Sequence, residues 1–458
     1  MAIRETVERE VKLRADEAFR LPELGGEPIE PRLFVSTYHD TADHRLARRG
    51  ITLRHRLENG KGLWQLKVPR AGSRLELEQA GAPGEPPAEL LTLLKGHLRG
   101  VPLVPIARLR TRREGIRADG AEIVHDTVAV LDHQRVTRRF EEVEVELLDG
   151  DEKTLRRLEK ALRRAGAADG ESRPKVFQAL DLDFQPDPGE SSDDGTTGGI
   201  LRARLREQAE RVLAHDPGTR LGTDPEELHQ QRVATRRLRA FLRAGRDLLD
   251  PAWAEPLRDE LRWLGGELGP VRDLDVLIEH LSAETAALGP DEAEGRKLVR
   301  TLERARRTAR RRLLAALDSP RYFALLDVLE RPFATVADEP TLAEIHAAEH
   351  RRLRKAVRAL TVDARDEELH AVRIKAKRAR YAAELRDDGD YVRAAKRLQD
   401  VLGEHQDAVV AVAELRSLAA RMPDTALAAG RLVEREQLRA HRGREEWRAS
   451  WKRLAKTA

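Results

Sequence analysis

A stretch with almost no apolar side chains divides this sequence into two parts with different patterns. Residues 184–199, FQPDPGESSDDGTTGG, combine Pro, Gly, Ser and Asp, a composition typical of a flexible linker. The chain has 458 residues, which is too long for one ordinary hydrophobic core. We therefore predict two domains, residues 1–183 and 200–458, joined by this linker.

Before the linker, short segments alternate between apolar and polar residues. Strict alternation indicates antiparallel strands, because successive side chains of a strand project to opposite faces. The predicted strands are residues 5–13, 51–57, 63–68, 74–78, 107–113, 123–131 and 138–148. Helical spacing adds two helices, at residues 89–98 and 152–165. The first domain is therefore expected to be an antiparallel sheet with flanking helices.

Several of these strands carry charged or polar side chains along one whole face. The sets that share a face are Glu8, Glu10 and Lys12; Arg54 and Arg56; Gln65 and Lys67; and Glu142, Glu144 and Glu146. For a single strand, a solvated sheet face is the ordinary explanation. Here acidic and basic residues segregate strand by strand, which favours a site that holds a polyanion together with divalent cations.

Composition restricts the chemistry further. The chain has no cysteine, which excludes disulfides, thiolate metal sites and cysteine nucleophiles. Charged residues make up 36% of the sequence and aromatic residues only 4%, so recognition is expected to rest on charge. We find no apolar run of membrane-spanning length and no signal-peptide core. We therefore expect a cytoplasmic protein with no membrane partner.

After the linker, Leu, Ala, Arg and Glu recur at helical spacing, which predicts an all-helical domain. An internal repeat becomes visible when HQQRVATRRLR, from residue 229, is aligned with HAVRIKAKRARY, from residue 370. The superposed pairs are His229 and His370, Arg232 and Arg373, Arg236 and Lys377, Arg237 and Arg378, and Arg239 and Arg380. Neither stretch contains an acidic residue, so each is expected to form a basic helical stripe that can bind an external polyanion. A third stripe, at Arg300, Arg304, Arg307 and Arg311, is more typical of a solvated face.

Residues 3–182 resemble the CYTH, or triphosphate tunnel metalloenzyme, family. Glu8-Arg9-Glu10-Val11-Lys12 matches its ExExK signature, and the other motifs follow in order. They are Tyr38–Thr41 leading to Arg54 and Arg56, Leu63–Pro69, Arg74–Glu78, Arg110–Arg113, His125–Val128, Glu144–Glu146 and Ser172–Lys175. The resemblance implies an eight-stranded antiparallel tunnel that hydrolyses triphosphates with Mg²⁺ or Mn²⁺ as cofactor.

Carried over position by position, the resemblance implies three roles for the charged residues. Those expected to bind the triphosphate are Lys12, Arg54, Arg56, Lys67, Arg110, Arg112 and Lys175. Those expected to bind metal are Glu8, Glu10, Glu78, Glu144 and Glu146. The catalytic candidates are Lys67, Glu10 and Glu144, and the carboxylate that activates water stays open. Alternation places Glu142 on the same face as Glu144 and Glu146, so Glu142 is a further candidate for the site. Arg113 is a further candidate phosphate ligand, because the sequence does not show which of several adjacent arginines faces the site.

Residues 200–458 resemble the CHAD domain, a pair of related helical bundles with a basic central groove. The resemblance rests on the two basic stretches and on LGPVRD and LGEHQD, which follow them at residues 268 and 402. It implies binding of inorganic polyphosphate by His229, Arg232, Arg236, Arg237, Arg239, His370, Arg373, Lys377, Arg378 and Arg380. The whole chain is therefore expected to be an α+β protein with an N-terminal β tunnel and a C-terminal all-α domain of two duplicated bundles.

The leading hypothesis is a divalent-metal-dependent triphosphatase that acts on inorganic triphosphate or a related short chain, with polyphosphate bound by the helical domain. One alternative is a non-catalytic polyphosphate-binding protein, associated with polyphosphate granules. Another is a nucleoside or RNA triphosphatase of the same fold, which the scarcity of aromatic residues disfavours. Nucleic acid is not the expected partner, and it stays open because any polyanion meets the same arginines. The oligomeric state stays open as well.

Overall fold

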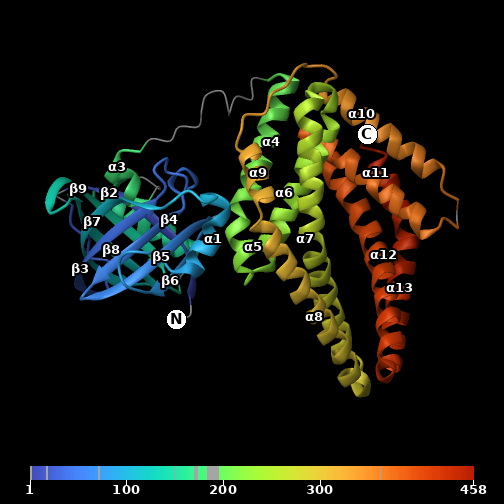
Figure 1. Ribbon diagram of the computed structural model, residues 1–458, viewed down its shortest axis with the longest axis horizontal. Helices are drawn as coiled ribbons and strands as arrows, with labels where there is room; N and C mark the ends of the chain where they lie inside the picture. Colours follow the sequence, from blue (N-terminus) through green and yellow to red (C-terminus); the bar gives the residue numbers. More distant parts are fainter. Residues whose placement is uncertain are drawn as a thin grey trace. The chain divides into compact units, whose positions relative to one another are not determined.

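The computed structural model describes residues 3–16, 19–70, 73–149, 151–169, 174–182, 195–361 and 363–457. The chain forms two compact units, residues 1–185 and 186–458 (Figure 1). Most of the predicted linker, residues 184–194, lies outside the described residues. The end of that linker is helical, because the Thr196 side chain accepts a hydrogen bond from the Gly199 amide and starts a helix at Thr197.

Unit 1 is built on one antiparallel sheet. Its strands are β1 (Arg4–Glu8), β2 (Glu10–Ala15), β3 (Glu27–Asp40), β4 (Thr52–Glu58), β5 (Lys61–Arg70), β6 (Ser73–Ala80), β7 (Val104–Ala118), β8 (Ala121–Asp132), β9 (Arg135–Leu147) and β10 (Ala168–Asp169). Their order is β1-β6-β5-β4-β3-β7-β8-β9-β2-β10.

The sheet closes on itself through its first segment. β1 and β2 are successive parts of one extended segment, separated only by Arg9, and β1 pairs with β6 while β2 pairs with β9. Counted as one strand, this segment completes a ring of eight antiparallel strands, to which the short β10 is added. The predicted fold class of the first domain is confirmed.

Strand β3 is missing from the strands predicted by alternation. Its sequence, EPIEPRLFVSTYHD, contains Pro28 and Pro31, and proline is disfavoured inside a strand because it lacks an amide donor. The structure pairs Pro28 with Ile116 of β7 and accommodates Pro31 at an irregular register between Ile29 and Arg32. The second half of β3, from Phe34 to His39, pairs with both β4 and β7.

Three helices complete unit 1: α1 (Ala88–Leu98), α2 (Glu152–Arg164) and α3 (Lys175–Leu180). The α1 and α2 helices confirm the two predicted helices. Leu155, Leu158 and Leu162 of α2 pack against Val143 and Val145 of β9. Since this outer face of β9 is apolar and covered, its three glutamates are left on the inner face. The short α3 packs its own apolar residues against β7 and β8.

Unit 2 is entirely helical, as predicted. Its helices are α4 (Thr197–Ala214), α5 (Asp216–Leu221), α6 (Pro225–Ala244), α7 (Pro251–Ala286), α8 (Glu292–Leu317), α9 (Pro320–Leu329), α10 (Leu342–Arg358), α11 (Asp366–Leu385), α12 (Gly389–Arg421) and α13 (Ala426–Leu454). None of the described helices is long and apolar enough to cross a membrane.

The duplication predicted from sequence is visible in the helix lengths. Helices α4, α6, α7 and α8 have 18, 20, 36 and 26 residues, and α10, α11, α12 and α13 have 17, 20, 33 and 29. His229 and His370 both stand at the fifth position of their helix. The two bundles meet where α6 contacts α11, with Arg236 donating a hydrogen bond to the Tyr381 hydroxyl at 2.7 Å.

Candidate active site and anion-binding groove

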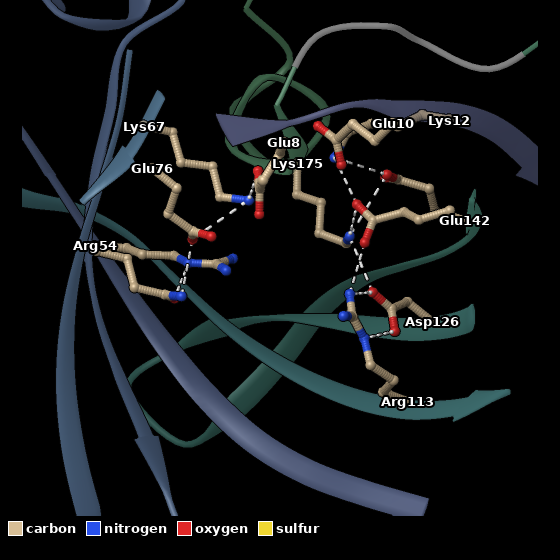
Figure 2. A network of polar contacts seen from close by, with 12 residues as sticks. Glu8, Glu10, Lys12, Arg54, Lys67, Glu76, Arg113, Asp126, Glu142 and Lys175 are labelled. Atoms are coloured by element: carbon tan, nitrogen blue, oxygen red, sulfur yellow. Dashed lines mark hydrogen bonds and ion pairs between the residues drawn. The ribbon is translucent and has the colours of Figure 1, made fainter. Parts of the chain in front are cut away.

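Charged side chains from many strands converge inside the closed sheet of unit 1 (Figure 2). Lys67 of β5 contacts Glu8 of β1 at 2.6 Å, across the intervening β6. Arg113 of β7 contacts Glu144 of β9 at 2.6 Å, across the intervening β8. Because such contacts bridge strands that are not neighbours, they lie on the concave inner face of the ring.

Glu144 is the centre of one part of this network. Lys12 and Arg113 contact its carboxylate, and Lys175 at the start of α3 reaches it at 2.7 Å. Burial by itself favours the neutral acid, but the three cations outweigh it and hold the pKa of Glu144 well below its usual range. Glu144 therefore acts as the shared counter-ion of three buried cations.

Asp126 of β8 fixes two of these cations from the other side. It is fully buried and accepts two hydrogen bonds from Arg113, at 2.8 and 2.7 Å, and it contacts Lys175 at 3.0 Å. Glu142 also lies nearby, 3.4 Å from Lys12. Sequence reasoning admitted Glu142 and Arg113 to the site, whereas Asp126 appeared only within a family motif and was given no role.

A second part of the network, beside Lys67, is rich in carboxylates. Lys67 contacts Glu8 and, at 3.5 Å, Glu76 of β6. Burial and a hydrogen-bond contact with Glu76 raise the pKa of Glu8. Glu10 is paired with Arg74 at 3.2 Å. Glu76 was not among the predicted site residues, although it stands on the same strand and the same face as the predicted Glu78.

Glu146 belongs to the same carboxylate-rich set. Within the described part of the chain, no hydrogen bond or ion pair holds its carboxylate. Burial and the charge of Glu8 are the main causes that raise the pKa of Glu146 to about 7, and Glu10 adds to the shift. The part of this shift that comes from Glu8 and Glu10 reflects an excess of negative charge around Glu146. A bound divalent cation would neutralise this excess.

The donor set therefore fits the predicted metal. Glu8, Glu10 and Glu146 offer only carboxylate oxygens, the ligands that Mg²⁺ and Mn²⁺ prefer. Among the described residues, no group of three or more acidic or histidine side chains is already arranged around a single ion position. The reason is visible in the contacts, because Lys67 and Arg74 occupy the carboxylates of Glu8 and Glu10.

Replacing Glu146 with glutamine is expected to stabilise the metal-free protein, and to do so more at pH 8 than at pH 5. The pKa of Glu146 is about 7 in the folded protein and 4.5 in an ordinary glutamate, so its proton stabilises the fold below pH 4.5 and is lost as the pH rises through 7. Glutamine does not ionise. Thermal unfolding in a chelator at both pH values measures the gain, with Glu152→Gln on the exposed start of α2 as the control. A gain that does not depend on pH would contradict the raised pKa.

A third part of the inner face is basic. Arg54 donates a hydrogen bond to the Tyr38 hydroxyl at 3.1 Å. Arg56 pairs with Glu58 at 3.0 Å, and its guanidinium lies 5.1 Å from the centre of the Phe34 ring. Burial and the charge of Arg54 lower the pKa of Arg56 to about 10. Here the cations are in excess, which suits a bound anion.

Two predicted site residues are not brought to the network. Arg110 and Arg112 are exposed on the outer face of β7, where Arg112 pairs with Glu114. Alternation places them there because Arg113 points inward, so Arg113 takes the place that the prediction gave to them. Glu78 lies on the same face of β6 as Glu76 and is joined to it through Gln65, whose side-chain amide donates to Glu76 at 3.0 Å and to Glu78 at 2.6 Å. Glu78 therefore lies at the edge of the network, and its predicted role as a metal ligand stays a prediction.

In unit 2, the basic stripes of α6 and α11 line one groove with a volume of about 600 Å³. Six of the ten predicted polyphosphate ligands lie in it: His229, Arg232, Arg236, His370, Arg373 and Lys377. Helices α7 and α13 add Arg272 and Arg439. Arg272 belongs to the LGPVRD stretch, whereas no sequence signal pointed to Arg439.

The other four predicted ligands lie outside the groove. Arg237 and Arg380 pair with the same carboxylate, Glu384, at 3.1 and 3.5 Å. Arg239 and Arg378 do not line the groove either. The groove uses only the first twelve positions of α6 and α11, so the later residues of each stripe lie beyond it.

The charge of the groove is unbalanced. Six of its lining residues are arginine or lysine, and only Asp273, Asp407 and Glu414 are acidic. Asp273 pairs with Arg232 at 3.0 Å. A concave surface on which cations outnumber acids attracts a polyanion.

Comparison with known proteins agrees with this division of the chain. The CYTH domain model matches residues 6–175, and the CHAD domain model matches residues 203–416. Two uncharacterized proteins from strains of Mycobacterium tuberculosis, Rv2226 and MT2285, are each 35% identical over 470 residues, covering 92% of this chain and 90% of their own.

Solved structures match one unit at a time. PptA from Streptomyces chartreusis is 27% identical over 56% of this chain and 99% of its own, with a TM-score of 0.49. The CHAD domain of the plant Ricinus communis is 27% identical over 58% and 94%, with a TM-score of 0.44. A putative adenylyl cyclase from Hippeastrum, described as having a dominant triphosphatase activity, is 18% identical over 39% and 98%, with a TM-score of 0.27. From the two domain matches, and from relatives that align with 92% of its length, the chain belongs to the CYTH–CHAD proteins.

Proposed function

We propose that unit 1 hydrolyses inorganic triphosphate or a related short-chain triphosphate with Mg²⁺ or Mn²⁺, and that unit 2 binds inorganic polyphosphate. One observation carries the first part. The inside of a closed sheet holds a group of buried cations beside a group of carboxylates, and one of these carboxylates, Glu146, lacks a partner among the described residues. A triphosphate and a divalent cation together would balance both groups.

The cations are suited to bind phosphate oxygens. Arg54, Arg56 and Arg113 carry guanidinium groups, which bind phosphate oxygens well. In the metal-free protein the Nε and Nη2 atoms of Arg113 are held by Asp126 and Glu144, so Nη1 is the atom that it can offer to a phosphate without breaking these bonds. Lys12 and Lys175 each contact Glu144 and two further carboxylates. An ammonium has three donors, so each lysine can exchange one carboxylate contact for a phosphate oxygen and keep the others. The site is therefore organised before the substrate arrives, because Glu144 and Asp126 fix the cations in place.

The carboxylates divide into two roles. Glu8, Glu10 and Glu146 would hold the metal ion, which supplies Lewis-acid stabilisation of the transferred phosphoryl group when it is bound. Glu144 is a poor proton acceptor because its pKa is held low, so its role is to position cations. Of the catalytic candidates, Lys67 and Glu10 lie in the carboxylate-rich set, where Lys67 can donate to a phosphate oxygen.

Phosphate release from the full-length protein tests this proposal. The substrates are inorganic triphosphate, ATP, thiamine triphosphate and long polyphosphate, each with and without Mg²⁺ or Mn²⁺. We expect metal-dependent release from triphosphate. Arg54→Ala is expected to reduce both binding and rate, by about 2 kcal/mol, since it removes charge-assisted hydrogen bonds to the substrate.

The other outcomes identify the alternatives. A preference for ATP over triphosphate would favour a nucleoside triphosphatase. Release from none of the substrates, with polyphosphate binding retained, would leave a non-catalytic polyphosphate-binding protein.

A further inference from the structure

Lys377 in the groove of unit 2 differs from the lysines inside unit 1. Lys12, Lys67 and Lys175 each contact at least one glutamate. Within the residues that the structure describes, no ion pair or hydrogen bond holds the Lys377 ammonium. It nevertheless lines a groove that is only partly open to solvent.

The surroundings of Lys377 disfavour its charged form. Burial and then the charges of Arg373, Arg236 and Arg232 lower its pKa to about 7, and Asp407 of α12 offsets only part of this shift. The remaining charged and titratable groups of the groove are His229, Arg272, Asp273, His280, His370, Glu414 and Arg439. Near neutral pH the amine form is therefore much more accessible to Lys377 than to an ordinary lysine, whose pKa is about 10.4.

We propose that Lys377 is a site of covalent acylation by small acyl phosphates, which bind in the groove through their phosphate group. The neutral Nζ attacks the acyl carbon and forms a C–N bond. The bond between the acyl carbon and the oxygen that bridges it to phosphorus breaks. Phosphate leaves with the electron pair, and the amine's extra proton passes to water. This inference goes beyond the proposed function and requires only that the groove bind a phosphate group.

The groove supplies both parts of this reaction. Arg232, Arg236 and Arg373 bind the phosphate and stabilise it as the leaving group, because guanidinium groups match phosphate oxygens. The same arginines keep Lys377 in its nucleophilic form. The amide product carries no charge and cannot be protonated, so acylation removes the positive charge that Lys377 carries in its ammonium form. Acylation of Lys377 would thus weaken the binding of a polyanion.

The test uses the full-length protein incubated with acetyl phosphate between pH 6 and pH 9. Peptide mass spectrometry measures the acetylation rates of Lys377 and of Lys375, which stands two residues earlier on α11 and does not line the groove. We expect Lys377 to react at least about tenfold faster, because a far larger fraction of it is neutral. Its rate should rise with a midpoint near pH 7. An excess of inorganic phosphate should slow Lys377 and leave Lys375 unchanged.

Arg373→Gln serves as the matched variant, with thermal unfolding to confirm that it is folded. It removes both a phosphate anchor and a nearby charge, so the reaction at Lys377 should slow and its midpoint should move to higher pH. Equal rates at Lys377 and Lys375 in the wild-type protein would overturn the proposal. So would a fast reaction at Lys377 that inorganic phosphate does not slow.

Discussion

Replacing Glu144 with glutamine is expected to destabilise unit 1 by about 3–5 kcal/mol, because the change leaves buried cations without their shared counter-ion. Lys12 and Lys175 have side chains that are only 9% and 7% exposed, and both depend on Glu144, as does Arg113. Hydrogen exchange followed by mass spectrometry measures the loss strand by strand in the full-length protein. The loss should be concentrated in β9 and its neighbours β8 and β2.

Glu146→Gln is the matched control for this experiment. Glu146 stands on the same strand and face as Glu144, two residues away, but no described residue pairs with its carboxylate. The two variants remove the same charge and should have opposite effects on stability at pH 8. If Glu144→Gln left the exchange of β9 unchanged, the view of Glu144 as a structural counter-ion would be contradicted.

The second large effect concerns the groove of unit 2. Replacing Arg232, Arg236, Arg373 and Lys377 together with glutamine is expected to weaken the binding of long polyphosphate at least about a hundredfold, because each cation contributes charge-assisted hydrogen bonds. Titration of the full-length protein at several salt concentrations measures this loss. The salt dependence should also become shallower, since fewer counterions are released on binding.

The control replaces the same number of basic residues on an exposed stripe of α8. Arg300, Arg304, Arg307 and Arg311 lie outside the groove and are exposed. Their replacement should change the affinity by less than about threefold, since exposed charges are screened at physiological salt. Equal losses in the two variants would show that polyphosphate binding depends on the overall charge of the protein and not on the residues of the groove. Tighter binding of duplex DNA than of polyphosphate would assign unit 2 to the nucleic-acid-binding proteins.

Alternation in the sequence predicted the inner face of β9 well, because Val143 and Val145 had to be covered by a helix and Glu142, Glu144 and Glu146 had to face the other way. The same reasoning failed on β7. Its RLRTRRE stretch has arginines on both faces, and the sequence pattern does not show which of them points inward. The contacts of Arg113 with Asp126 on the neighbouring β8 and with Glu144 on β9 decide this, because they form only when the strands pair.

A similar limit applies to unit 2. Helical spacing predicted the duplicated basic stripes, and both histidines and the first basic residues of each stripe lie in one groove. Spacing along a single helix could not show where the groove ends, since this depends on how α6 meets α11. Spacing along α6 and α11 also could not predict Arg439, because this residue reaches the groove from α13. Likewise, the raised pKa of Glu146 results from the convergence of several strands and leaves no trace in the local sequence.

The central claim is that carboxylates inside the closed sheet bind a divalent cation for triphosphate hydrolysis. The most direct test is phosphate release from inorganic triphosphate at pH 8, with and without Mg²⁺, by the wild-type protein and by Glu146→Gln. We expect metal-dependent release by the wild type and a loss of at least about a hundredfold in the variant, which should be folded and more stable than the wild type. Full activity of Glu146→Gln, or release by the wild type that needs no metal, would contradict it.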